Sequence, residues 1–142
     1  MTVCFCGHGK LYNEYDRIKG KCFDTVQGLI LKGADSFLVG DYGDFDGLAA
    51  SVCLALRKDN LIKVCLVLPY YQPHIDEYEK LRRDKFDSII TPDLSNTPHR
   101  FRIFKANQYM VNESDTVIAY VRTSYGGAAK TLKYVKKKAK IS

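Results

Sequence analysis

Short apolar runs alternate along this chain with longer segments in which apolar residues recur every three or four positions. The runs are typical of strands covered on both faces, and the longer segments are typical of helices with one buried face. The sequence predicts strands at 2–6, 35–39, 62–68, 88–91 and 116–121, and helices at 14–32, 45–58, 73–86, 100–111 and 127–138. This alternation favours an α/β, Rossmann-like three-layer sandwich with a mostly parallel sheet of about five strands. We expect a single domain spanning residues 1–142.

Two glycine-rich turns each connect a predicted strand to the helix that follows it. Gly40 and Gly43 come after the second strand, and Gly126 and Gly127 come after the fifth. A strand that turns through glycine into a helix presents free backbone N–H groups and the positive end of the helix dipole. Such a turn suits a phosphate or a carboxylate. Two of these turns in one small domain predict a site for a phosphorylated, nucleotide-like ligand.

Ligands of open α/β sheets bind outside the carboxyl ends of the strands, near the point where the strand order reverses. Four segments of this chain follow predicted strands and are expected there, namely 7–9, 40–46, 69–72 and 122–127. They come from distant parts of the sequence and would meet at one edge of the sheet. Their convergence supports a binding site more strongly than either glycine turn alone.

Side chains in and near these segments add candidate ligand-binding residues to the four glycines and to Gly7. Asp46 can hydrogen-bond a ribose hydroxyl or a base amine, or it can cap the start of its own helix. His8 can contact the ligand or act as a general acid, or it can make a structural hydrogen bond to a neighbouring loop. Gln72 and Asn107 carry amides that suit the edge of a base or a ribose.

The last predicted helix carries the whole positive excess of the chain. The net charge is +6, and the last thirteen residues hold six lysines and no acid, so the 16 remaining basic residues equal the 16 acidic ones. Such a run is a solvated face, or it steers an anionic ligand or a nucleic acid. Lys130 lies one turn into this helix, on the phosphate side or in solvent. Tyr125, just before the helix, can stack on a base or serve packing.

The rest of the composition narrows the function classes. No apolar run approaches the roughly 18–20 residues needed to cross a bilayer. No basic region precedes the apolar amino-terminal stretch, so we expect a cytoplasmic protein without a signal peptide. The five cysteines include no Cys-x-x-Cys, and there is no His-x3-His pair. We therefore expect free thiols, no structural metal and no resident cofactor.

Several motifs taken together resemble a known group. The opening Val3-Cys-Phe-Cys-Gly7-His8 is similar to the Phe-Thr-Gly-His opening of YpsA-like proteins in the SLOG superfamily, which also includes the LOG and DprA domains. The similarity continues, in the same order and spacing, at Gly40-x-x-Gly43-x-Asp46-x-x-Ala49-Ala50, Leu68-Pro69-Tyr-Tyr-Gln72, Asn107-Gln-Tyr-Met-Val-Asn-Glu-Ser114-Asp115 and Gly126-Gly127. The resemblance therefore spans nearly the whole chain.

The resemblance implies a Rossmann-like fold with a pocket for a nucleotide or a nucleotide-derived ligand. Several SLOG domains resemble sensors of NAD-derived or ADP-ribose-like signals, LOG members are phosphoribohydrolases, and DprA members bind single-stranded DNA. LOG enzymes use the pattern Pro-Gly-Gly-x-Gly-Thr-x-Glu, whose Glu helps the glycosidic bond to break. Leu132 stands at the position of that acid here, so the LOG-type catalytic Glu is not found.

Three functions follow from these features. The leading hypothesis is a domain that binds an NAD- or ADP-ribose-like nucleotide ligand as a sensor, a carrier or a sequestering protein. The alternative is a nucleotide N-glycosidase or phosphoribohydrolase-like enzyme with rearranged acids, such as Asp46 or Asp115. The second alternative is nucleic-acid binding through the lysine-rich helix. We expect no membrane partner, and the resemblance implies a possible homo-oligomer.

Overall fold

The computed structural model describes residues 1–69, 85–94 and 96–138. Its strands are β1 (Thr2–Gly7), β2 (Ser36–Val39), β3 (Lys63–Val67), β4 (Ser88–Ile90) and β5 (Thr116–Tyr120), and its α-helices are α1 (Tyr15–Leu31), α2 (Asp44–Arg57), α4 (Arg102–Asn112) and α5 (Gly127–Lys138). Short 3₁₀ turns, Tyr12–Glu14 and His99–Phe101, precede α1 and α4. The helix predicted at 73–86 lies almost entirely outside the described residues. None of the described helices is long and apolar enough to cross a membrane.

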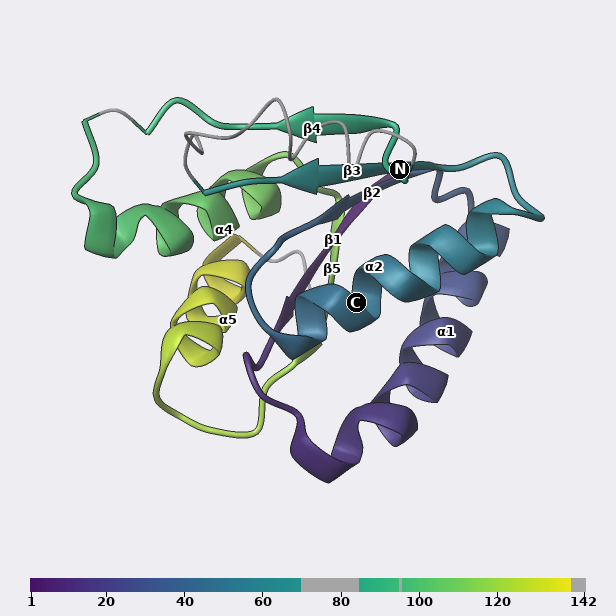
Figure 1. Cartoon of the computed structure of the whole chain (residues 1–142), viewed down its shortest axis with the longest axis horizontal. Coiled ribbons are helices and arrows are strands. Elements are labelled where there is room, and N and C mark those ends of the chain that lie inside the picture. The colour runs from purple at the N-terminus through teal and green to yellow at the C-terminus, as the bar shows by residue number, and fades with distance from the viewer. Residues whose placement is uncertain (70–84, 95, 139–142) are drawn as a thin grey trace.

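The described strands form one five-stranded sheet in the order β4-β3-β2-β1-β5, and every neighbouring pair is parallel. The predicted α/β sandwich is thereby confirmed. The chain steps outward from β1 to β4 and then returns to the other side of β1 to form β5 (Figure 1). The strand order therefore reverses between β1 and β5, which is where sheets of this kind bind ligands.

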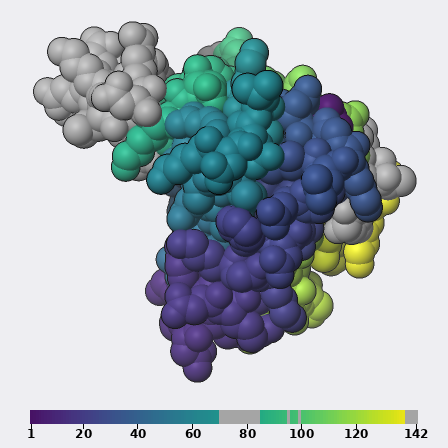
Figure 2. Space-filling view, turned by 90° about the vertical axis from the view of Figure 1, so that its right-hand side faces the viewer, coloured from purple at the N-terminus to yellow at the C-terminus, as the bar shows by residue number. Residues whose placement is uncertain are grey.

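The two faces of the sheet carry separate layers of helices. Alternate residues of β1 point to opposite faces, so Val3 and Phe5 pack under α1 and α2, whereas Cys4 and Cys6 pack under α4 and α5. Figure 2 looks onto the first layer, where α1 and α2 pack side by side. All five cysteines are buried free thiols, as expected.

The loop that follows β1 is tied to the start of α2 by three hydrogen bonds. The backbone N–H of Asp44 donates to the Gly9 carbonyl at 2.8 Å, and that of Phe45 donates to the His8 carbonyl at 3.3 Å. The Asp44 carboxylate in turn accepts the backbone N–H of Leu11 at 2.9 Å. These bonds bring the loops after β1 and β2 together at the carboxyl edge of the sheet.

This contact depends on the absence of side chains at two glycines. Gly43 has a φ of +96°, and a Cβ atom at Gly43 would lie only 2.5 Å from the Gly9 Cα atom. A Cβ atom at Gly7 would lie 2.3 Å from the ring of Phe45. The packing of the protein therefore requires glycine at both positions.

We predict that Gly43→Ala lowers the free energy of unfolding by about 2–4 kcal/mol, because it adds both backbone strain and a backbone clash. The matched control is Gly20→Ala in α1, where an added Cβ meets nothing within 4 Å. This control should raise the stability by about 0.5–1 kcal/mol through helix propensity. Urea denaturation measures both changes, and equal effects of the two substitutions would contradict the account.

Candidate functional site

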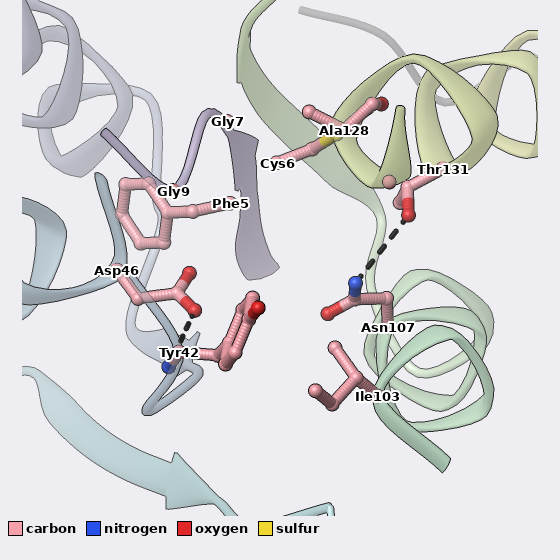
Figure 3. Close-up of a pocket in the computed structure, with 11 residues that line it drawn as sticks. Phe5, Cys6, Gly7, Gly9, Tyr42, Asp46, Ile103, Asn107, Ala128 and Thr131 are labelled. Carbon is pink, nitrogen blue, oxygen red and sulfur yellow. Dashed lines mark hydrogen bonds between the residues drawn. The ribbon is translucent and has the colours of Figure 1, made fainter. Parts of the chain in front are cut away.

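A cavity of about 240 Å³ opens at the carboxyl ends of the central strands, beside the reversal of strand order. Its walls come from the end of β1, the loop after β1, the turn before α2, the first turns of α2 and α5, and α4 (Figure 3). Three of the four segments expected at this edge therefore border one cavity or its surroundings. Of the fourth, Pro69 borders a small extension of the same space, and 70–72 lie outside the described residues.

The start of α5 offers backbone donors to this cavity. Gly127 and Ala128 line the cavity, and the first helical hydrogen bond runs from the Lys130 N–H to the Gly126 carbonyl at 3.0 Å. In the described part of the chain, no group accepts a hydrogen bond from the amides of Gly127 and Ala128. A Cβ atom at Gly127 would meet nothing within 4 Å, so packing does not require this glycine. This end of the helix is suited to an anion.

The start of α2 differs from the start of α5, although both follow a glycine-rich turn. The first two amides of α2 are already bonded to the carbonyls of Gly9 and His8. Its first turn also carries the carboxylates of Asp44 and Asp46. A Cβ atom at Gly40 would lie 2.8 Å from Oδ2 of Asp46, so this glycine makes room for the acid. The two turns are therefore not equivalent anion sites.

Asp46 is a half-buried acid in the cavity wall. Removal from water raises the pKa of its carboxyl group to about 7, and the negative charge of Asp41 adds to this effect. The hydrogen bond that Oδ2 accepts from the Tyr42 N–H at 3.0 Å acts in the opposite direction. Near neutral pH the carboxyl group is therefore protonated in a large fraction of molecules, and it can then donate as well as accept a hydrogen bond.

The wall opposite Asp46 is formed by α4 and α5. The Asn107 side chain donates from Nδ2 to Oγ1 of Thr131 at 3.4 Å. In Figure 3, Asp46 and Asn107 lie on opposite walls, with the ring of Tyr42 at the edge between them. Tyr42 is 62% exposed, which leaves its ring accessible at the mouth of the cavity.

The structure gives the predicted site residues different positions. Those that line the cavity are Gly7, Asp46, Asn107 and Gly127, while Gly40 borders its small extension and Gly43 packs against Gly9. Tyr125 is 77% exposed and lies outside the lining. The Lys130 ammonium lies 4.3 Å from the centroid of the Phe104 ring. Gln72 is outside the described residues.

His8 does not line the cavity, and its side chain makes the structural hydrogen bond that was one of its two interpretations. Its Nε2 atom accepts the backbone N–H of Arg122 at 2.7 Å. The imidazole also meets the ring of Tyr120 edge-on, with 5.8 Å between the ring centroids.

The cavity also contains residues that sequence reasoning missed. Tyr42 stands between Gly40 and Gly43 and could have been selected as part of that turn. Thr131 lies one helical turn after Gly127, a spacing that brings both to one face of α5. Ile103 gives no sequence signal, because only the tertiary position of α4 brings it to the cavity.

Candidate catalytic groups are few in this cavity. Asp115 accepts the Thr2 N–H at 2.8 Å beside the first residues of β1, at the opposite end of the strands from the cavity, so it cannot act there. The Cys6 thiol donates to the Ala128 carbonyl at 3.4 Å, and burial raises its pKa to about 12, which leaves it a poor nucleophile. Within the described ranges, no three His, Cys, Asp or Glu residues are grouped to hold a metal ion.

Comparison with known proteins adds information about the fold. No protein-family model matches the chain, and no curated protein matches it. A solved structure of DNA processing protein A from Helicobacter pylori, described for its single-stranded DNA binding mode, is similar with a TM-score of 0.65 and 16% sequence identity. The match covers 99% of this chain and 63% of that one, so this chain spans less than two thirds of its length. At this identity the likeness shows a shared Rossmann-like fold.

We predict that Asp46 makes stability depend on pH in a definite direction. Because its folded-state pKa of about 7 exceeds the ordinary 3.8, its contribution to stability is complete below about pH 4 and is lost as pH rises to about 7. Asp46→Asn removes this titration. The stability of the variant relative to the wild type should therefore increase by about 3–4 kcal/mol between pH 4 and pH 8. Urea denaturation at several pH values measures both proteins. Parallel profiles of unfolding free energy against pH for the wild type and Asp46→Asn would contradict the burial of this acid.

Proposed function

We propose that this chain binds a nucleotide or a nucleotide-derived ligand, such as an NAD- or ADP-ribose-like molecule, in the cavity beside β1 and β5. The observation that carries the proposal is the pair of unbonded amides at the start of α5, which open into a cavity of about 240 Å³. A phosphate at these amides gains hydrogen bonds and a favourable interaction with the helix dipole.

The opposite wall supplies the groups that the rest of a nucleotide needs. Asp46 can accept from a ribose hydroxyl or a base amine, and Asn107 can both donate and accept. Tyr42 offers an exposed ring at the mouth for stacking on a base. The cavity is smaller than the roughly 300–1,000 Å³ of sites for drug-sized ligands. The cavity can therefore hold part of a nucleotide, such as its phosphate and ribose, and the rest of the ligand extends past Tyr42.

The small number of acids in the cavity favours binding of the ligand over its hydrolysis. Leu132 stands where a LOG-type enzyme has its acid, and Asp46 is the acid that lines the cavity among the described residues. The protein acts on this account as a sensor, a carrier or a sequestering domain. Release of free base from AMP or GMP, abolished by Asp46→Asn, would instead support the enzymatic alternative.

We predict that Gly127→Asp abolishes nucleotide binding without unfolding the protein. The new side chain has open space, and a carboxylate in the first helical turn interacts favourably with the helix dipole. It repels a phosphate at the same amides. The control is Gly127→Asn, which adds nearly the same volume without the charge and should retain more affinity than Gly127→Asp.

A thermal-shift screen with AMP, GMP, ADP, ADP-ribose, NAD and cyclic ADP-ribose isomers measures this effect. A ligand at about 100 times its dissociation constant adds roughly 2.7 kcal/mol of stability, which raises the midpoint of unfolding by roughly 5–15 °C. Equal shifts for the wild type and Gly127→Asp would show that the phosphate does not bind at the start of α5. No shift with any compound would count against the proposed ligand class.

A second candidate function is single-stranded nucleic-acid binding, favoured by a group of cations and rings on α4, α5 and the 3₁₀ turn before α4. This cation–aromatic surface consists of Arg100, Phe101, Phe104 and Lys130. The Lys130 ammonium lies 4.3 Å and 5.8 Å from the centroids of Phe104 and Phe101, and the Arg100 guanidinium lies 4.8 Å from that of Phe101. Basic groups beside aromatic rings are the features that bind single strands without sequence preference.

We predict for this second function that Lys130→Ala weakens binding of a labelled oligothymidylate. It should also lower the slope of log affinity against log salt concentration by about 0.7, the contribution of one phosphate contact to a single strand. The matched control is Lys19→Ala, which removes a similar lysine–tyrosine contact on α1, in the other helix layer. Fluorescence anisotropy at several salt concentrations measures both variants. Identical curves for the two variants would show that the cation–aromatic surface does not bind the oligothymidylate.

A further inference from the structure

The loop after β1 contacts the turn before α5 as well as the turn before α2. Its backbone carbonyls bind the start of α2, while the His8 side chain accepts the Arg122 N–H at 2.7 Å. An imidazole nitrogen that accepts a hydrogen bond carries no proton, so His8 is neutral here and its proton is on Nδ1. One short loop thus holds both glycine turns in place.

The residue that His8 binds is also anchored through its side chain. The Arg122 guanidinium lies 3.1 Å from Oε2 of Glu14, and the Tyr120 hydroxyl donates to the same oxygen at 3.0 Å. Arg17 donates to the other oxygen of Glu14 at 2.8 Å. The Tyr120 hydrogen bond and the two arginines hold the pKa of Glu14 below its ordinary value. This carboxylate is therefore charged near neutral pH and holds the Arg122 side chain.

Only a short turn separates this anchor from the amides at the start of α5. Within it, the Thr123 hydroxyl donates to the Tyr125 carbonyl at 2.8 Å, and Gly126 adopts a φ of +91°. Gly127 then begins α5 and lines the cavity. The position of Arg122 therefore determines where the turn begins.

We propose that His8 is a positioning residue for the nucleotide site. Its Nε2 lone pair holds the Arg122 amide, and the 122–127 turn consequently presents the amides of Gly127 and Ala128 to the ligand. This inference rests on the proposed nucleotide function and adds to it the residue that positions its anion-binding turn. Loss of the His8 acceptor frees the Arg122 amide and lowers ligand affinity.

Two substitutions separate the effect of the hydrogen-bond acceptor of His8 from the effect of its aromatic ring. His8→Gln retains an acceptor oxygen within reach of Arg122, whereas His8→Phe retains a ring against Tyr120 but has no acceptor. With AMP as the probe at about pH 8, His8→Gln should bind within about threefold of the wild type, and His8→Phe about tenfold more weakly.

A second readout tests the positioning without any ligand. Amide hydrogen exchange at Arg122, followed by NMR, should be slow in the wild type and His8→Gln and at least about tenfold faster in His8→Phe. Unchanged exchange in His8→Phe would overturn the inference, as would equal AMP affinities of His8→Gln and His8→Phe. If His8→Phe does not fold, His8→Leu, which also lacks an acceptor, is measured in its place. If AMP does not bind the wild type, the nucleotide proposal fails at this probe, while the exchange measurement still decides the role of His8.

Discussion

The close approach of Gly9 and Gly43 is the contact on which the rest of the site depends. Because Gly43 has no side chain, the loop after β1 reaches the start of α2 and accepts its first amides on the carbonyls of Gly9 and His8. The same loop holds the segment after β5 through the His8 imidazole. The carboxyl edge of the sheet is thus organised around one loop that lies between two glycine turns.

This arrangement makes the two turns chemically different. The start of α2 has its amides bonded and its acids in place, whereas the start of α5 has open amides beside a glycine that packing does not require. A ligand with one anionic end and one hydrogen-bonding end matches this polarity. The high pKa of Asp46 reduces the negative charge that such a ligand meets near neutral pH. The asymmetry is the physical basis for placing a nucleotide in one orientation.

The sequence was sufficient for the fold because hydrophobic periodicity sets the faces of strands and helices. β1 and α5 begin where they were expected, and the neighbouring strands of the described sheet are parallel, as the alternation of strands and helices favoured. It was insufficient for the site, since both turns are rich in glycine and tertiary hydrogen bonds decide which of them has open amides. The position of the Lys130 ammonium over Phe104 and the hydrogen bond of His8 to Arg122 depend on segments far apart in the chain. No local pattern encodes such pairs.

The most direct test of the central claim is a titration with AMP followed in ¹⁵N-resolved amide NMR spectra. The account predicts that the amide signals of Gly127 and Ala128 shift most, because their N–H groups receive the phosphate. The signals of Asp44 and Phe45 should change little, because their N–H groups are already bonded. Large shifts at Asp44 and Phe45 with none at Gly127 would contradict it. Shifts confined to the lysines of α5 would contradict it equally.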